Sequence, residues 1–187
     1  MDNFQQFIVT SRYCRWLEDK GRRETWDECV DRYFNYLHYR FPELQEESKV
    51  MDTLSGTVKD LKVFPSMRAL MTAGPAADVD DVCTYNCSYL AIDRISSFSD
   101  VLYILCCGTG VGFSCEGKEV EKLPTIPETI NRREDCYIVV EDSRVGWANA
   151  YRSLMKCLYD GVHPTWDTSL IRPAGARLKT FGGRSSG

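Results

Sequence analysis

The chain has 187 residues, of which 43% are hydrophobic and 27% are charged, and it carries 13 glycines, 7 prolines and 9 cysteines. This length predicts one domain, or one domain with a small appendage, and the apolar content excludes disorder for most of the chain. The formal net charge of −4 argues against a general nucleic-acid binder or an anionic-membrane binder, because either needs a basic excess.

The sequence shows neither a secretory signal nor a membrane-spanning segment. No apolar run reaches the roughly 18 residues that a spanning helix needs, and the N-terminus MDNFQQFIVTSRYCRW lacks the basic and then apolar regions of a secretory signal. Nine cysteines are an odd number in a chain too long for a disulfide-stapled mini-domain. We therefore expect a cytoplasmic protein with reduced thiols and with no membrane or nucleic-acid partner.

Residues 1–62 are expected to be helical and to serve as scaffold. Thr25 and Glu28 have the spacing of a capping box, and apolar residues follow at the helical period. Pro42 ends that stripe, and a second helix is expected over about 43–61.

The next segment alternates between turn formers and short apolar runs. Residues 65–81 are rich in turn formers and predict an irregular, exposed connection, whereas the apolar run 87–92 suits a buried strand. A short helix capped by Ser97 and Asp100 should follow and end at Gly108. The segment GTGVGFSCE should then turn into another strand.

The last third shows a strand and a longer helix. Residues 116–135 are charged and contain prolines, which predicts a loop or an inserted appendage, and 137–142 is a strand candidate. A helix capped by Ser143 is expected next, with Gly161 just past its end. The tail 169–187 reads as a strand fragment that runs into a Gly/Ser-rich loop. Together these elements predict an α/β fold.

The glycines at positions 108, 110 and 112 do not form a dinucleotide fingerprint. That fingerprint needs the order strand, glycine turn, helix, so that the helix N-terminus faces the pyrophosphate. Here a helix precedes the glycines and a strand follows them. The residues alone favour a helix C-cap and a turn that permits close backbone approach.

The cysteines and histidines show no complete metal or triad pattern. Cys83 and Cys87 stand four apart, but paired zinc knuckles need a second such unit or a histidine pair. The only histidines, His38 and His163, are distant in sequence, and two histidines give little choice of base for a catalytic triad. Cys87 opens a strand beside a Gly/Pro-rich connection and is a candidate site thiol. The other cysteines are expected to pack as small hydrophobes.

Six segments in order resemble the monomeric, adenosylcobalamin-dependent (class II) ribonucleotide reductases of the ribonucleoside-triphosphate reductase type. The segments are RYCRWLEDKGRRETWDECVDR (12–32), FPSMRALMTAG (64–74), YNCSYLAI (85–92), SFSDVLYILCCGTGVGFS (97–114), EDSRVGWANAYRSLM (141–155) and IRPAGARLKTFGGRSSG (171–187). They spread over nearly the whole chain, so this chain is similar to an N-terminal part of such a reductase.

The resemblance implies an organisation for the chain. Residues 1–62 would be the N-terminal helical region, and 63–114 the first strands of a ten-stranded α/β barrel that this chain leaves incomplete. Residues 115–181 would be an insertion of the kind that holds an allosteric deoxynucleotide effector, and 182–187 a Gly/Ser-rich loop where the chain ends. Unpaired barrel edges predict poor solubility or partner dependence for 63–187.

The resemblance also implies a chemistry. The family abstracts the ribose 3′ hydrogen with a cysteine thiyl radical and reduces the 2′ carbon with two further cysteines, the first of which maps to Cys87. The substrate-binding positions that it implies are Ser66, Asn86, Ser88, Gly108 and Gly110. Adenosylcobalamin would be bound mainly by a C-terminal part, and no metal site is implied.

The partners implied are a ribonucleotide substrate, a deoxynucleotide effector, a thioredoxin-like reductant and a C-terminal complementary fragment of the same enzyme. The thiyl cysteine and the second reducing cysteine would lie in that fragment, so the chain alone should be inactive. One alternative is a nucleotide-binding or regulatory module of the same fold that has lost catalysis. Another is a redox or zinc protein that uses Cys83 and Cys87.

Overall fold

The computed structural model describes residues 1–178 and 184–186, and its contacts divide the chain into two units. The first unit comprises Met1–Tyr85 and Leu178, and the second comprises Asn86–Arg177 and 184–186. The predicted Gly/Ser-rich loop at 182–187 lies outside the described residues except for 184–186. The fold is α/β, as predicted, with helices throughout the first unit and parallel strands in the second.

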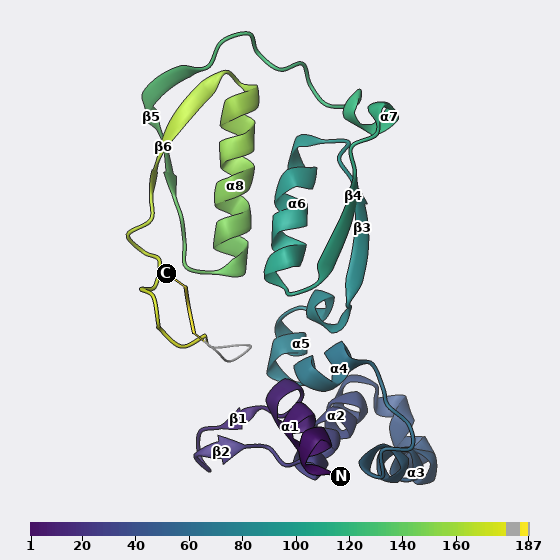
Figure 1. The fold of residues 1–187 in the computed structure, drawn as a ribbon. Helices are drawn as coiled ribbons and strands as arrows, with labels where there is room; N and C mark the ends of the chain where they lie inside the picture. The colour runs from purple at the N-terminus through teal and green to yellow at the C-terminus, as the bar shows by residue number, and fades with distance from the viewer. Residues whose placement is uncertain (179–183, 187) are drawn as a thin grey trace. The chain divides into compact units, whose positions relative to one another are not determined.

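The first unit is mainly helical, as expected for residues 1–62 (Figure 1). Its elements are α1 (Asn3–Arg12), β1 (Trp16–Leu17), β2 (Arg22–Arg23), α2 (Trp26–Arg40), the 3₁₀ helix η1 (Pro42–Glu47), α3 (Ser48–Lys59), α4 (Met67–Thr72), α5 (Pro75–Val79) and the 3₁₀ helix η2 (Asp81–Thr84). The capping box is confirmed, since the Glu28 amide donates to Thr25 Oγ1 and the Thr25 amide donates to Glu28 Oε2. The expected second helix is divided, because Pro42 starts a 3₁₀ helix and α3 begins only at Ser48. The short antiparallel hairpin β1–β2 was not predicted.

Aromatic packing around Trp26 forms the core of the first unit. The Trp26 ring stacks on Phe64 with a centroid distance of 5.3 Å and meets Tyr13 edge-on at 6.2 Å. Its indole Nε1 donates to the Lys59 carbonyl at 3.1 Å, which ties the start of α2 to the end of α3. The buried residues of this cluster are Val9, Cys14, Trp26, Cys29, Val30, Phe34, Met51, Val58 and Leu70.

The expectation of an irregular, exposed connection at 65–81 is wrong. The segment forms α4, α5 and η2, and Leu70, Ala76 and Ala77 are buried. Its turn formers occupy helix ends: Ser66 caps α4, and Pro75 begins α5 after Gly74 at a positive φ. The turn-forming residues in this segment therefore indicate where its helices begin and end, and they do not indicate that helices are missing.

Two arginines hold the end of α4 in place. Arg15 donates to the carbonyls of Met71 and Thr72, and Arg32 donates to those of Leu70 and Ala73 at 2.9 Å each. The last carbonyls of a helix lack intrahelical partners, and cationic donors satisfy them. These contacts join residues that are 38 to 57 positions apart in the sequence.

The second unit consists of two parallel strand–helix–strand motifs. Its elements are β3 (Cys87–Ala91), α6 (Ile95–Cys106), β4 (Gly110–Ser114), α7 (Gly117–Val120), β5 (Asn131–Val139), α8 (Arg144–Tyr159) and β6 (Val162–Asp167). β3 pairs with β4 and β5 pairs with β6, each in parallel. Figure 1 shows α6 and α8 side by side, with β3 and β4 beside α6 and with β5 and β6 beside α8.

Several boundaries in the second unit differ from prediction. α6 begins at Ile95, so Ser97 and Asp100 lie inside the helix and do not cap it. Ser97 is fully buried, and its Oγ donates to Asp93 Oδ1 at 3.2 Å instead of capping the first turn. Gly108 ends the helix at φ +81°, as expected, and Ser143 caps α8 by accepting from the Gly146 amide.

The region after β4 also holds more regular structure than predicted. Residues 116–135 are not all loop, because α7 and the start of β5 lie within them. β6 was not predicted: His163 and Pro164 belong to this strand and not to a loop. In the described part of the tail, 169–178 and 184–186, the predicted strand is represented only by an isolated bridge between Arg177 and Arg184, and the rest of the tail lies outside the described residues.

Polar contacts fasten α6 to α8. Arg152 donates from Nε to Ser99 Oγ at 3.0 Å and from Nη2 to Asp100 Oδ1 at 3.1 Å. Arg144 Nη1 lies 3.2 Å from Cys107 Sγ, which is buried. The two strand–helix–strand motifs therefore meet through their helices.

Gly146 allows the first turn of α8 to approach the end of β5. A Cβ at this position would lie 2.5 Å from the Glu141 carbonyl oxygen and 2.6 Å from Glu141 Cβ. We expect Gly146→Ala to lower the free energy of unfolding by roughly 1–3 kcal/mol, the usual cost of overpacking. This change in the free energy of unfolding is measured by urea titration, with circular dichroism as the probe. Gly56→Ala is the control, because a Cβ at Gly56 in α3 meets nothing within 4 Å and alanine favours helix; equal midpoints for the two variants would contradict the prediction.

Candidate functional site

The amino ends of β3 and β4 bring together four of the six predicted site residues. Cys87 pairs with Gly110 in the parallel register, and the Gly110 amide donates to the Asn86 carbonyl at 2.9 Å. Ser88 Oγ donates to the Gly110 carbonyl at 3.2 Å. The Cys87 side chain is exposed, although the sequence predicted a buried strand here. The strand is half exposed because β4 is its only partner among the described residues.

Strand alternation decides which of these side chains share a face with Cys87. Side chains two apart lie on the same face of a strand, and paired residues of parallel strands share a face. Cys87 therefore shares its face with Tyr89, Gly110 and Gly112. Ser88 lies on the opposite face, and its hydroxyl already has a partner in the Gly110 carbonyl.

The two glycines leave the face beside Cys87 without side chains. Gly110 and Gly112 lie opposite Cys87 and Tyr89 in the register, so the surface next to the thiol is backbone. A Cβ at Gly110 would come within 3.4 Å of the Asn86 carbonyl oxygen, which is tighter than ordinary contact. A ligand can therefore reach the thiol along an open backbone surface that is flanked by the exposed Tyr89 ring. The resemblance did not point to Tyr89; strand alternation from Cys87 finds it.

The glycine turn itself closes α6 and begins β4. The Gly108 amide donates to the Leu105 carbonyl at 2.8 Å, and Thr109, which is 2% exposed, donates to the Ile104 carbonyl. This is the helix C-cap and close backbone approach that the residues alone favoured. Gly108 lies two residues before Gly110, at the same end of the motif as Cys87.

Ser66 belongs to the first unit. Its side chain caps α4 by accepting from the Ala69 amide at 3.5 Å, and the residue is exposed. The structure thus gives Ser66 a local structural role, and its contact with substrate stays a prediction.

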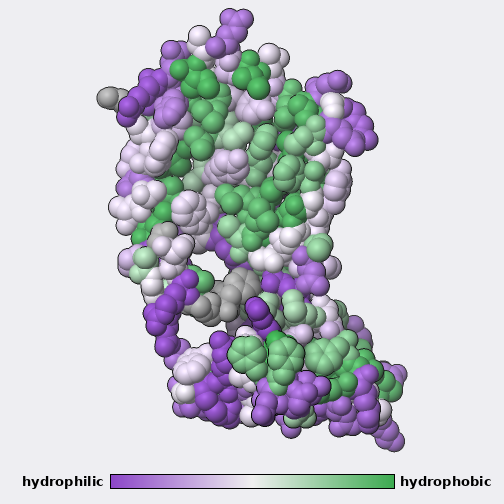
Figure 2. Space-filling model, viewed as in Figure 1, coloured by the Kyte–Doolittle hydropathy of each residue, from purple (hydrophilic) through white to green (hydrophobic). Residues whose placement is uncertain are grey.

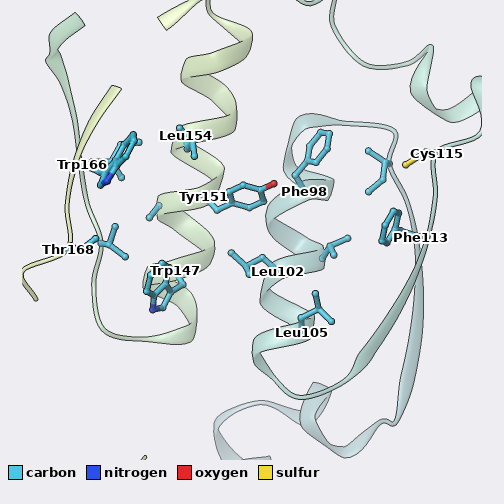
Figure 3. A pocket seen from close by; sticks show the side chains of 15 residues that line it. Phe98, Leu102, Leu105, Phe113, Cys115, Trp147, Tyr151, Leu154, Trp166 and Thr168 are labelled. Carbon is cyan, nitrogen blue, oxygen red and sulfur yellow. The ribbon is translucent and has the colours of Figure 1, made fainter. Parts of the chain in front are cut away.

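The opposite face of β3 and β4 borders an apolar cavity of about 720 Å³ in the second unit. Figure 3 shows Tyr151 projecting from α8 toward α6, with Phe98 and Leu102 on α6, Phe113 on β4 and Trp166 on β6 around the same space. Figure 2 shows hydrophobic side chains gathered on this face of the molecule over the two helices. None of the described residues that line the cavity is charged. It therefore suits apolar groups and does not suit the phosphates of a nucleotide.

The other cysteines were expected to pack as small hydrophobes, and this is wrong for Cys115, which follows β4 and is exposed. Cys14, Cys29, Cys83 and Cys107 are buried, and burial raises the pKa of the half-buried Cys106. Among residues 1–178 and 184–186, no three His, Cys, Asp or Glu side chains are grouped so that they could hold a metal ion. In the same residues, every helix is too short or too polar to cross a membrane.

Comparison with known proteins gives one consistent result, although no family model matches the chain. An adenosylcobalamin-dependent ribonucleoside-triphosphate reductase of Euglena gracilis is 26% identical over 91% of this chain and 26% of its own length. Its counterpart in Lactobacillus gasseri is 25% identical over 94% of this chain and 33% of its own length. A putative reductase of the same description from Mycobacterium phage D29 is 26% identical over 97% of this chain and 30% of its own length.

The fold agrees with these relatives. The crystal structure of a B12-dependent (class II) ribonucleotide reductase superposes with a TM-score of 0.80 at 24% identity, over 96% of this chain and 34% of that one. The predicted resemblance is confirmed: the chain is similar over nearly its whole length to adenosylcobalamin-dependent ribonucleoside-triphosphate reductases and fits an N-terminal part of them. It spans about a third of the length of the curated relatives that it matches.

Proposed function

We propose that this chain is an N-terminal part of a ribonucleotide reductase that reduces ribonucleoside triphosphates to deoxyribonucleotides. The observation that carries the proposal is the exposed Cys87 thiol beside the side-chain-free surface of Gly110 and Gly112, in a chain similar to these reductases. Activity requires the remaining part of the enzyme, whether on the same polypeptide or on a separate one.

Cys87 would act as the first of two reducing cysteines. The net reaction replaces the 2′ C–OH bond of the ribose by C–H and releases water, while two thiols lose two hydrogens and become a disulfide. A thioredoxin-like dithiol then restores both thiols by exchange. An exposed thiol at the end of a strand is accessible both to a sugar and to a reductant. The second cysteine and the thiyl radical would come from the remaining part.

The substrate would lie against the backbone of β4. Asn86, which is exposed, and the glycines at 108 and 110 would border the ribose, since Gly110 pairs with Cys87 in the register and carries no side chain there. Ser88 would act by holding the Gly110 carbonyl, since its hydroxyl donates there.

The described residues do not fit adenosylcobalamin. Its corrin carries amide side chains and a phosphate, whereas the cavity of the second unit offers aromatic and aliphatic side chains and no charged group. The relatives are adenosylcobalamin-dependent, so we propose that the cofactor is held mainly by the part of the enzyme that this chain does not include.

The uncovered sheets support a larger barrel. Parallel sheets are normally covered on both faces, yet Tyr89 on β3 is 70% exposed. We propose that further strands of a ten-stranded barrel pair with the free edges and that their apolar side chains fill the cavity. Residues 115–181 would then contribute to a deoxynucleotide effector site, and the assembled enzyme would be cytoplasmic.

Reconstitution tests this function. The chain is mixed with the remaining two-thirds of the reductase from the same genome, adenosylcobalamin, a ribonucleoside triphosphate and a dithiol, and deoxynucleotide is measured by chromatography. We expect product from the mixture and none from either part alone. If the mixture is inactive while the isolated chain binds nucleoside triphosphates in calorimetric titration, the chain is a nucleotide-binding module and the proposal is wrong.

A further inference from the structure

A second pair of thiols lies in the second unit, away from the face of Cys87. Cys136 Sγ and Cys157 Sγ are 2.9 Å apart, although the residues are 21 positions apart in the sequence. Cys136 lies in β5 and Cys157 near the end of α8. Both are free thiols.

The packing of β5 on α8 holds the two sulfurs together. Alternation along β5 puts Cys136 on the same face as Ile138 and Val140, which are both buried. The helical period of α8 puts Cys157 on the same side as Leu154 and Ala150. These residues form one apolar cluster, and the thiols continue it at one end. A disulfide needs a sulfur–sulfur distance of about 2.05 Å, so a shift of about 0.9 Å closes the bond.

The pair is also accessible. A pocket of about 340 Å³ lies between β5 and α8 and is lined by both cysteines together with the polar side chains of Glu141, Asn149 and Ser153. The buried pair Cys14 and Cys29 in the first unit differs: each is at most 3% exposed, and each thiol donates to a backbone carbonyl, that of Thr25 and that of Tyr13. A small oxidant therefore reaches Cys136 and Cys157 but not Cys14 and Cys29.

We propose that Cys136 and Cys157 form a dithiol site that a small-molecule disulfide such as oxidised glutathione converts to a disulfide between β5 and α8. In the first step the Cys136 thiolate attacks one sulfur of the oxidant, a mixed disulfide forms and one small thiol leaves. In the second step Cys157 loses its proton and attacks Cys136 Sγ, and the second small thiol leaves. Two protein thiols are oxidised, and one oxidant disulfide is reduced to two thiols. The site does not depend on the proposed reductase function, and none of its residues takes part in the steps assigned to Cys87.

The order of the two steps follows from the surroundings of Cys157. Burial, and then the neighbouring Cys136, raise the pKa of Cys157 to about 11, which disfavours the thiolate of Cys157, whose sulfur lies 2.9 Å from Cys136 Sγ. Attack on an external disulfide requires a thiolate, so we assign the first attack to Cys136, which lines the same pocket. Once formed, the bond would tie α8 to β5 at one wall of the apolar cavity, since Ile138 and Leu154 line that cavity.

The test is a redox titration of the full chain. The reduced protein is equilibrated with mixtures of reduced and oxidised glutathione, free thiols are blocked by alkylation, and peptides are identified by mass spectrometry. We expect a Cys136–Cys157 peptide pair that has lost two hydrogens, while Cys14 and Cys29 stay alkylated. Dithiothreitol should reverse the change, and the oxidised protein should melt roughly 5–10 °C higher than the reduced one.

Serine variants separate the two thiols. Cys157→Ser should accumulate a glutathione adduct on Cys136, because the second thiol that would displace glutathione is missing, and Cys136→Ser should show at least a several-fold slower adduct formation on Cys157. Circular dichroism checks that both variants are folded. The proposal is overturned if Cys136 and Cys157 stay reduced while the exposed Cys87 and Cys115 take up glutathione, or if Cys14 and Cys29 oxidise equally.

Discussion

Cys87→Ser is expected to lower multiple-turnover deoxynucleotide formation by the reconstituted reductase on the order of 10³-fold or more, as the loss of an essential reacting group does. A serine hydroxyl cannot be oxidised to a disulfide, so the two electrons that reduce the 2′ carbon have no source on this strand. The side chain is exposed, and the exchange of sulfur for oxygen disturbs no packing. The free energy of unfolding should therefore stay unchanged, which separates a chemical role from a structural one.

Cys106→Ala is the matched control for that experiment. Cys106 is the last residue of α6, is half-buried, and takes part in no proposed step, so its removal should leave turnover near the wild-type rate. If Cys87→Ser supports the same multiple-turnover rate as Cys106→Ala, then Cys87 is not a reducing cysteine, even if the reconstituted enzyme is active.

Local sequence signals were sufficient to predict a helix end where the residues that form the cap are close together in the sequence. The capping box of Thr25 and Glu28 and the Ser143 cap each depend on residues within three positions of one another, and both were predicted. The C-cap at Gly108 is local in the same sense, because only glycine adopts its positive φ without strain.

Elements that depend on distant partners were missed. The segment 65–81 reads as a connection, and what folds it is a set of hydrogen bonds from Arg15 and Arg32 to the carbonyl groups of its first helix. β6 contains His163 and Pro164 and reads as a loop, but the register of β5 makes it a strand. Periodicity within a window cannot show pairing across some thirty positions.

In the candidate site, too, the features that depend on nearby residues were predicted, and those that depend on distant partners were not. The resemblance pointed to Cys87. The glycines at 108, 110 and 112, taken without the resemblance, predicted only a turn at which another group can approach the backbone closely. The parallel register is what places Gly110 and Gly112 on the Cys87 face and Ser88 on the other, and this register follows from strand pairing and not from motif spacing. The contact between Cys136 and Cys157 likewise arises from the packing of a strand on a helix.

Arg32→Ala is expected to lower the free energy of unfolding by about 3–5 kcal/mol, the usual cost of removing one partner of a buried ion pair. Arg32 binds Glu24 with two bonds, Nε to Oε1 at 2.7 Å and Nη2 to Oε2 at 3.0 Å, and Glu24 is only 6% exposed. Its remaining Nη1 donor serves the carbonyls of Leu70 and Ala73. Alanine would leave a buried carboxylate without its main cation and two helix-end carbonyls without donors. Domain stabilities are about 5–15 kcal/mol, so a large share of the total would be lost.

Two further variants show whether the loss of stability in Arg32→Ala comes from the buried, two-bond contact between Arg32 and Glu24. Arg32→Lys keeps the charge but has no planar fork, so it should recover less than half of the loss. Arg22→Ala removes a cation 2.7 Å from Glu28 at an exposed position and should barely move the urea midpoint, since solvent screens that pair. Urea unfolding of the full chain, followed by circular dichroism, compares all three. Equal midpoints for Arg32→Ala and Arg22→Ala would mean that the buried pair does not hold α4 in place, and the folding of 65–81 would then have to come from the burial of Leu70 and the alanines of α5 alone.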